Sequence, residues 1–210
     1  MSDTPGKVRG VIFDFGRVIS DFDINRFITR IALRSRLPEH EIRRNVSLGT
    51  ALAVRYETGL ITSDEFFREI CSLAALTMAR EEFIRAYTDI FTPKAETFAL
   101  VKSFKGKYAL GLLSNTNEWH YEYGIRPVEI FPLFEAVTLS FEVRAMKPDR
   151  RMYEDVLAKL RLPAGACVYI DDIQEYVDAG RALGLRAIRY TTHDRLIEDL
   201  AAAGVRITHV

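Results

Sequence analysis

The chain has little cysteine and no excess of either charge. Its two cysteines, Cys71 and Cys167, lie far apart in the sequence and among apolar residues. We expect reduced core thiols, with a disulfide as the alternative. Lysine and arginine together number 29, as do aspartate and glutamate, so the net charge is zero. A neutral chain argues against nucleic acid as the main partner.

Long apolar runs and targeting signals are also missing. No apolar stretch approaches the roughly 20 residues that cross a bilayer, and the opening MSDTPGKVRG lacks the profile of a signal peptide. These absences predict no membrane partner and a cytoplasmic location. Repeats and low-complexity tracts are absent too. The 210 residues, 48% of them hydrophobic, suit one ordinary domain with a small insertion.

Short β-rich runs recur along the chain, and helical patterns separate the later ones. The runs cover residues 8–14, 108–114, 136–140, 166–171 and 186–190. Strands that alternate with helices predict an α/β fold with a parallel sheet. We therefore expect a Rossmann-like parallel sheet of about five strands flanked by helices.

The long interval between the first two runs shows no convincing strand. Helical patterns cover residues 24–36, 39–46, 50–57, 64–76, 81–91 and 93–104. Thr62 and Glu65 predict a capping box, Gly59 a helix end, and Pro93 the first turn of the last helix.

This pattern predicts two domains. We expect residues 1–19 and 93–210 to form an α/β core domain, and residues 20–92 to form an inserted, all-helical cap. Such a cap would close over Asp14 and select the substrate. The alternative is one α/β domain with a long helical excursion.

The residues able to do chemistry stand mostly where apolar runs end. Asp14 ends the run VIFD, Ser114 ends LGLLS, and Asp171 and Asp172 end CVYIDD, whereas Lys147 lies in RAMKPD before a helix. Each has an ordinary explanation alone, as a turn residue, a helix cap or a solvated lysine. Together they supply the carboxylate, hydroxyl, ammonium and acid pair that metal-assisted phosphoryl transfer requires.

The adjacent acids Asp171 and Asp172 suggest a cation. Two carboxylates at a buried strand end repel each other unless a cation or protons compensate them. A hard divalent ion with oxygen ligands is the natural compensation, and Mg²⁺ is the usual choice beside phosphate.

In their order, spacing and placement these motifs resemble the haloacid dehalogenase superfamily, most of whose members are phosphatases. The resemblance is closer to its sugar-1-phosphate phosphatase branch, whose opening pattern is Phe-Asp-x-Gly-Asn-Val. The segments FDFGRVISDFDINRF, RYETGLITSDEF and LSNTN all fit that branch. The resemblance extends from Val8 to about Tyr190.

The resemblance implies a role for each motif residue. Asp14 would attack phosphorus and form an aspartyl phosphate. Mg²⁺ would be held by Asp14, by the backbone carbonyl of Gly16 and by Asp172, with Asp171 as a supporting partner.

The substrate contacts are implied in the same way. Ser114 and Asn115 would hydrogen-bond the transferring phosphoryl group, and Lys147 would neutralise its charge and that of Asp14. Arg17 has two open interpretations, a clamp on phosphate or a side chain pointing into solvent.

The chain departs from the family pattern at four positions. Gly16 replaces the Asp that most family phosphatases use to protonate the leaving group, a gap that the closer branch shares. Arg17 replaces Gly or Asn, Arg144 stands where relatives often have Gly, and Tyr176 where many have Asn. The last two put fine positioning in doubt rather than the reaction class.

Three residues are candidates for the missing proton donor: His120, which could instead be a surface helix histidine, and Asp21 and Asp23 at the cap entrance. A nearby aromatic cluster could wall the pocket or pack against the cap. Its members are Trp119, Tyr121 and Tyr123.

The sequence thus predicts a Mg²⁺-dependent phosphatase of a small phosphorylated metabolite, which could be a sugar phosphate, and leaves its oligomeric state open. One alternative is a 2-haloacid dehalogenase, because halide leaves without a proton and Gly16 is then no handicap. The acid pair argues against it, since such dehalogenases work without metal. The other alternative is a non-catalytic binding protein that retains the fold.

Overall fold

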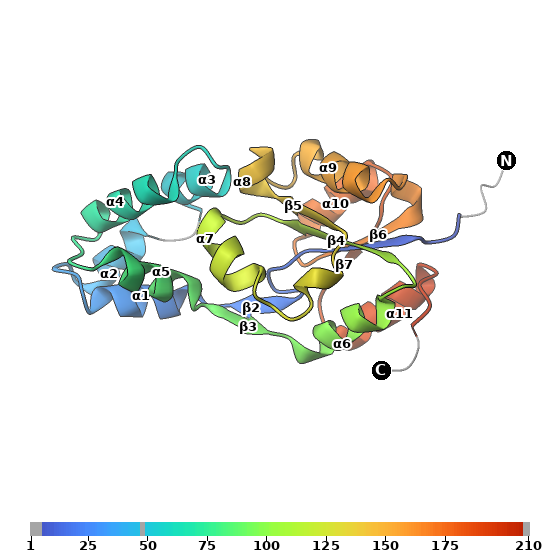
Figure 1. The fold of residues 1–210 in the computed structure, drawn as a ribbon, viewed down its shortest axis with the longest axis horizontal. Helices are drawn as coiled ribbons and strands as arrows, with labels where there is room; N and C mark the ends of the chain where they lie inside the picture. Colours follow the sequence, from blue (N-terminus) through green and yellow to red (C-terminus); the bar gives the residue numbers. More distant parts are fainter. Residues whose placement is uncertain (1–5, 47–48, 208–210) are drawn as a thin grey trace.

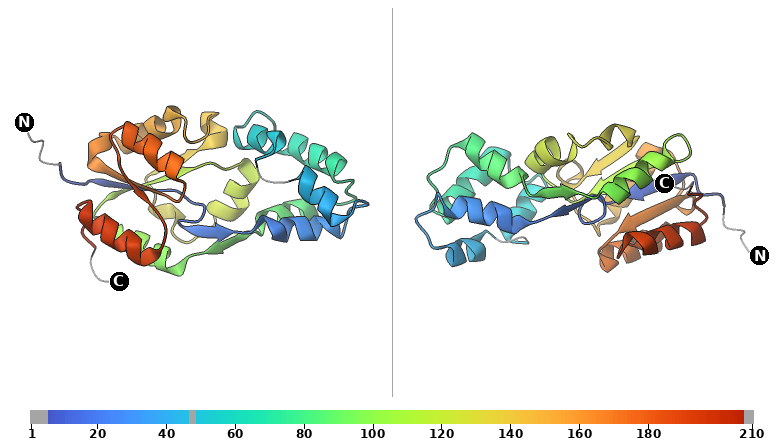
Figure 2. Two further views of the ribbon diagram at one scale, coloured as in Figure 1. Left: turned by 180° about the vertical axis from the view of Figure 1, so that it is seen from behind. Right: turned by 90° about the horizontal axis from the view of Figure 1, so that it is seen from below.

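The computed structural model describes residues 6–46 and 49–207. Residues 1–5 and 208–210, at the ends of the predicted core domain, and residues 47–48, inside the predicted cap, lie outside this description. Figures 1 and 2 show an elongated molecule with a twisted sheet at one end and a group of helices at the other.

A parallel sheet of five strands, in the order β5-β4-β1-β6-β7, forms the first part. Each neighbouring pair is parallel, so the predicted α/β fold class is confirmed. The first strand along the chain, β1, is central and pairs with both β4 and β6. The strands are β1 Gly10–Phe13, β4 Ala109–Ser114, β5 Ala136–Leu139, β6 Cys167–Asp171 and β7 Arg186–Arg189.

Helices cover both faces of this sheet (Figure 1). Because side chains alternate along a strand, Val11 and Phe13 pack on one face with α6 and α11, whereas Ile12 packs on the other with α9 and α10. The helices are α6 Ala95–Phe104, α9 Arg150–Leu160, α10 Gln174–Ala182 and α11 His193–Ala202. Burial on both sides explains why the strands are continuous apolar runs.

The second part consists of five helices that share a hydrophobic cluster of their own, joined by Trp119 from the sheet part. They are α1 Ile24–Ala32, α2 Glu39–Asn45, α3 Ala51–Glu57, α4 Ser63–Leu73 and α5 Arg80–Thr88. The predicted capping box of Thr62 and Glu65 opens α4, and Gly59 follows α3 with a φ of +64°, as a helix end favours. The division into core and cap domains stays a prediction.

Two short strands join the parts, and the sequence missed them. β2, Ser20–Phe22, pairs antiparallel with β3, Phe91–Pro93. Three residues are too few to show an alternation, so the expectation of no strand was wrong at both ends of the interval. Pro93 ends β3 rather than opening a helix, because a two-stranded ribbon tolerates proline at its edge. Helix α6 therefore begins at Ala95.

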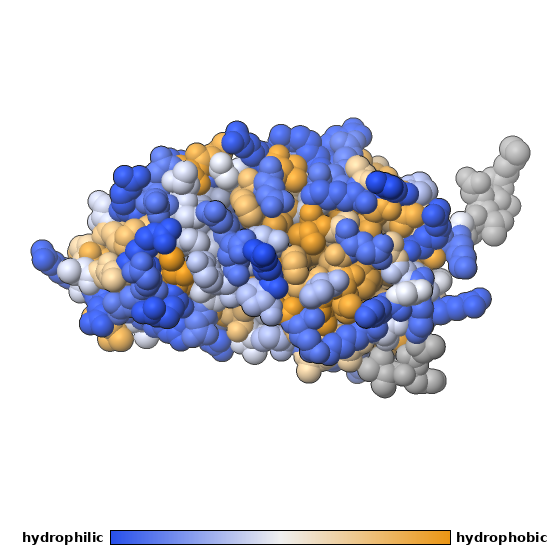
Figure 3. Space-filling model, viewed as in Figure 1, coloured by the Kyte–Doolittle hydropathy of each residue, from blue (hydrophilic) through white to orange (hydrophobic). Residues whose placement is uncertain are grey.

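Shorter elements complete the chain. They are α7 Glu118–His120, the π-helical turn η1 Tyr121–Ile125, η2 Phe131–Leu133, α8 Ser140–Val143 and η3 Ala164–Ala166. On the face shown in Figure 3, hydrophobic residues gather mainly over the sheet part, and the helical end is more hydrophilic. In the described ranges, no helix combines the length and apolar composition that crossing a membrane requires.

Candidate active site

The predicted residues meet at the carboxyl edge of the sheet. Asp14 directly follows β1, Ser114 ends β4, and Asp171 ends β6. Since β1 lies between β4 and β6, these three strand ends are neighbours, and such an edge is where open α/β sheets bind ligands. Asp14, Ser114, Lys147 and Asp172 line one cavity of about 250 Å³.

Lys147 is buried at the centre of this group. Its Nζ lies 2.8 Å from Oδ1 of Asp14 and 2.6 Å from Oδ2 of Asp171, and it donates to the carbonyl of Leu113 at 3.2 Å. Burial by itself would lower the pKa of Lys147, but the two carboxylates outweigh it and raise the pKa above its ordinary value. The side chain is therefore an ammonium ion, not the solvated lysine that the motif alone suggested.

Asn115 holds Lys147 in place. The backbone N–H of Lys147 donates to Oδ1 of Asn115 at 2.7 Å, and Nδ2 of Asn115 donates to the Lys147 carbonyl at 3.2 Å. Tyr176 completes the arrangement, with its hydroxyl 3.4 Å from Asn115 Nδ2 and its ring centroid 5.1 Å from Lys147 Nζ. The side-chain amide of Asn115 is thus already occupied by the protein.

Three carboxylates surround one point. Oxygens of Asp14, Asp171 and Asp172 all lie within 4.8 Å of one another. Asp171 is fully engaged, because Oδ2 meets Lys147 and the Tyr169 hydroxyl and Oδ1 accepts the Ile173 N–H at 2.9 Å. Asp14 and Asp172 therefore keep oxygens available for a cation.

The electrostatics also fit a cation. Burial raises the pKa of Asp14 to about 7, with Lys147 opposing the rise and Asp171 and Asp172 adding to it. Burial, followed by the charge of Asp171, raises the pKa of Asp172 as well. Lys147 and the exposed Arg17 together leave three carboxylates with surplus negative charge, and oxygen donors are those that Mg²⁺ prefers. The residues present fit that ion.

Gly16 lies beside Asp14, where a side chain would be crowded. A Cβ at this position would be 3.9 Å from Oδ2 of Asp14 and 3.2 Å from Cε1 of Phe22. No described residue donates a hydrogen bond to Oδ2, and Asp14 lines the cavity. The side chain of the Asp that the family pattern has at position 16 would begin here, beside Oδ2 of Asp14.

Both arginines that depart from the family pattern have left-handed backbones. Arg17 has a φ of +58° and Arg144 a φ of +55°, a conformation that Gly and Asn adopt at lower cost. This explains why Gly or Asn is the common residue there. The Arg17 side chain is 62% exposed and its Nε lies 3.9 Å from Oδ2 of Asp172, so it lines the mouth of the cavity and faces solvent.

Of the three predicted proton donors, His120 lines the cavity and Asp21 and Asp23 are not among its described lining residues. His120 is buried rather than on the surface, stacked on Tyr87, and burial lowers its pKa to about 4. Its Nε2 lies 3.1 Å from the Tyr87 carbonyl and its Nδ1 3.0 Å from Asn117 Nδ2, so both nitrogens are engaged. Asp21 pairs with Lys94, and Asp23 caps α1.

The three residues of the predicted aromatic cluster lie in different surroundings in the structure. Trp119 packs edge-on against Tyr56 among the helices, Tyr121 packs against Phe131, and Tyr123 is exposed. None of the three is among the described residues that line the cavity.

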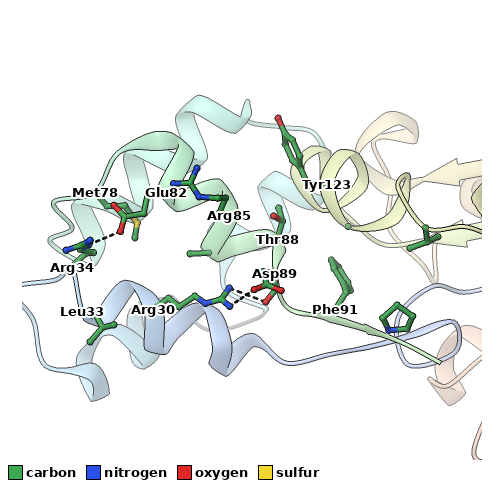
Figure 4. A pocket seen from close by; sticks show the side chains of 14 residues that line it. Arg30, Leu33, Arg34, Met78, Glu82, Arg85, Thr88, Asp89, Phe91 and Tyr123 are labelled. Carbon is green, nitrogen blue, oxygen red and sulfur yellow. Dashed lines mark hydrogen bonds and ion pairs between the residues drawn. The ribbon is translucent and has the colours of Figure 1, made fainter. Parts of the chain in front are cut away.

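Tyr123 instead lines a larger, open groove of about 790 Å³ beside α1 and α5 (Figure 4). Arg30 pairs with Asp89 there, and Arg34 with Glu82 at 2.8 Å. Asp14, Ser114 and Lys147 are not among the described residues that line this groove. The smaller cavity, which they do line, is therefore the candidate site.

Sequence reasoning missed Glu57. This last residue of α3 lines the cavity, and burial raises the pKa of its carboxyl group to about 7. A signal was present in RYETG, because a glutamate in the last turn of a helix is disfavoured by the helix dipole. Glu57 is far from the other motifs along the sequence, so the sequence did not indicate that it lies in the same cavity.

Comparisons with known proteins agree with this geometry. A family model described as haloacid dehalogenase-like hydrolase matches residues 8–184. A phosphatase of Mycobacterium tuberculosis is 25% identical over 210 residues, covering 94% of this chain and 96% of the relative. The D-ribitol-5-phosphate phosphatase of Bacteroides thetaiotaomicron is 22% identical over 189 residues, covering 87% and 91%.

A solved structure is also similar. A haloacid dehalogenase family enzyme of Bacteroides thetaiotaomicron, in complex with magnesium and inorganic phosphate, superimposes with a TM-score of 0.77 at 22% identity. The match covers 88% of this chain and 94% of that one. At this identity the likeness concerns the fold.

Proposed function

This chain belongs to the haloacid dehalogenase-like hydrolases, and on that premise we propose that it is a Mg²⁺-dependent phosphatase of small phosphorylated metabolites. The observation that carries the proposal is the buried ammonium of Lys147 between two carboxylates, beside a third acid and an open carboxylate oxygen. That set matches what covalent transfer of a phosphoryl dianion requires.

In this proposal Asp14 is the nucleophile. Lys147 holds Oδ1 of Asp14 at 2.8 Å, which leaves Oδ2 to attack phosphorus and form the aspartyl phosphate. Among the described residues, the Ser114 hydroxyl makes one long hydrogen bond, 3.5 Å to the Asn115 carbonyl, so it can turn to a phosphoryl oxygen. Water then attacks the aspartyl phosphate and releases inorganic phosphate.

Asn115, Lys147 and Arg17 serve substrate binding. Asn115 acts by fixing Lys147, whose ammonium balances the negative charge that the phosphate brings. Arg17 places a second positive charge at the mouth of the cavity. A buried, fixed charge stabilises the transferring group far more than a mobile one in water.

Asp14, Asp172 and the carbonyl of Gly16 would hold Mg²⁺, with Asp171 supporting them from behind. When bound, the ion supplies positive charge that offsets the phosphate and orients it toward the nucleophile. Asp171 binds Lys147 instead, which fits a supporting place.

Residues 20–92 act in this proposal as a cap. Phe22, Gly49, Glu57 and Ile90 from this segment line the cavity together with the motif residues of the sheet part. A cap in this position excludes water from the phosphoryl group and strengthens the electrostatic interactions around it. A cavity of about 250 Å³ favours a small organic phosphate.

The test is a panel of phosphate monoesters, including sugar and polyol phosphates and an aryl phosphate, assayed with Mg²⁺ and with a chelator. We expect phosphate release that needs Mg²⁺ and that Asp14→Asn abolishes without loss of fold. Turnover of a 2-haloacid in chelator, without phosphate release, would instead identify a dehalogenase. Ligand binding without turnover of any panel member would identify a binding protein.

A further inference from the structure

One acid in the cavity has no partner among the residues that the structure describes. The carboxyl groups of Asp14 and Asp172 each have a positive charge nearby. Glu57 lines the same cavity, yet none of the described residues makes a hydrogen bond or an ion pair to its carboxyl group. Its side chain is half-buried, so the carboxyl group is partly desolvated without a compensating partner among these residues and is available to a ligand in the cavity.

The fold holds Glu57 firmly beside the motif residues. Oγ of Ser140 lies 2.6 Å from the Glu57 carbonyl and 2.8 Å from the carbonyl of Thr116, two residues beyond Ser114. At Gly59, even a Cβ would lie 2.2 Å from the carbonyl oxygen of Phe141. The end of α3 therefore packs on the start of α8, and Ser140 of α8 also bonds Thr116 in the loop that follows β4.

The surroundings of Glu57 do not supply a compensating charge. On α5 the neighbouring Tyr87 stays neutral, because burial and then the nearby Glu57 raise its pKa well above the ordinary value. His120 on α7 stays neutral because burial lowers its pKa to about 4. The other charged groups of the cavity are those of the motifs and of Arg17.

We propose that Glu57 is the general acid of the reaction, and that it donates the proton that the missing side chain at position 16 cannot supply. The inference rests on the proposed phosphatase function and adds the residue that decides which esters are hydrolysed. Its physical support is the unpaired carboxyl group in the cavity, and a pKa of about 7 keeps much of it protonated at neutral pH.

Oδ2 of Asp14 forms a bond to phosphorus, the bond from phosphorus to the ester oxygen breaks, and its electron pair stays on that oxygen. The proton of the Glu57 carboxyl group moves to the same oxygen, so an alcohol leaves and Glu57 becomes a carboxylate. When water attacks the aspartyl phosphate, Glu57 takes the proton of water and Asp14 is restored.

This role predicts the substrate class. An aryl or acyl oxygen departs readily as an anion, but the oxygen of a simple alcohol does not. An acid in the cavity therefore extends the activity to phosphate monoesters of ordinary alcohols, such as polyol and primary sugar phosphates.

The experiment compares wild type, Glu57→Gln and Glu69→Gln over a series of aryl and alkyl phosphates with Mg²⁺. Glu69 is the control, because it lies on the neighbouring helix α4, pairs with Arg55 on the surface and is 42% exposed. We expect Glu57→Gln to lower kcat for alkyl phosphates by roughly 10²–10⁴-fold and for 4-nitrophenyl phosphate by less than about tenfold. In wild type, kcat/KM for alkyl phosphates should fall as pH rises through about 7, and this limb should vanish in Glu57→Gln.

An equal loss for every leaving group, or a loss confined to KM, would overturn the assignment while leaving the phosphatase proposal intact. Retention of full alkyl phosphatase activity in folded Glu57→Gln would overturn it as well. Failure of wild type to hydrolyse even the aryl phosphate would overturn the proposed function itself, and the role of Glu57 with it. Glu69→Gln should match wild type throughout.

Discussion

The half-buried carboxyl group of Glu57 predicts that stability depends on pH. Its pKa is raised from an ordinary 4.5 to about 7 by burial, so the folded state binds more protons than the unfolded state between these values. Its contribution to stability is fully present below about pH 4.5 and is lost as pH rises toward about 7. The corresponding free energy is roughly 3 kcal/mol.

Glu57→Gln removes this dependence while keeping the shape of the side chain. At pH 5 the variant and wild type should unfold at similar temperatures. At pH 8 the variant should be more stable by up to roughly 3 kcal/mol. For a chain of this size each kcal/mol moves Tm by roughly 2–4 °C, so the gap should approach about 6–12 °C.

The assay is thermal unfolding of both proteins, followed by circular dichroism between pH 5 and pH 8, with Glu69→Gln as control. Glu69→Gln should show no gap that grows with pH, because its side chain lies on the surface. If the Tm difference between Glu57→Gln and wild type were the same at pH 5 and pH 8, the carboxyl group would not be buried as a neutral acid. A variant more stable but less active on alkyl phosphates would show that the fold retains this residue for function.

Three further changes have defined outcomes. Lys147→Met should destabilise the protein by about 3–5 kcal/mol in urea unfolding, because it leaves two buried carboxylates without their cation; a loss below about 1 kcal/mol would mean that water reaches them. Arg144→Gly should raise stability by about 1 kcal/mol, since glycine adopts a φ of +55° without strain, and a lower Tm would contradict this. Gly16→Asp should restore alkyl phosphatase activity to Glu57→Gln and change wild type little, provided that the Phe22 ring, 3.2 Å from the new Cβ, moves aside; an equal gain in both backgrounds would argue against Glu57 as the existing acid.

Much of the fold follows from local patterns in the sequence. The ends of the five predicted runs lie within two residues of the ends of the five strands of the sheet. The runs could be recognised because strands buried on both faces have few polar residues. The capping box at Thr62 and Glu65 was readable because its residues are three positions apart. The ribbon of β2 and β3 was not readable, since its partners are about 70 residues apart and each is too short for a periodic pattern.

The candidate site, too, could be predicted in part from local sequence patterns. The sequence by itself determined that Asp14, Ser114 and Asp171 stand at strand ends, and a parallel sheet then brings such ends to one edge. Only the tertiary structure decided that Lys147 is buried between two carboxylates, that His120 is buried at the wall of the cavity, and that Glu57 reaches the cavity. The physical reason is that burial and pairing depend on helices packing across long stretches of chain, and these contacts set the charge of each group.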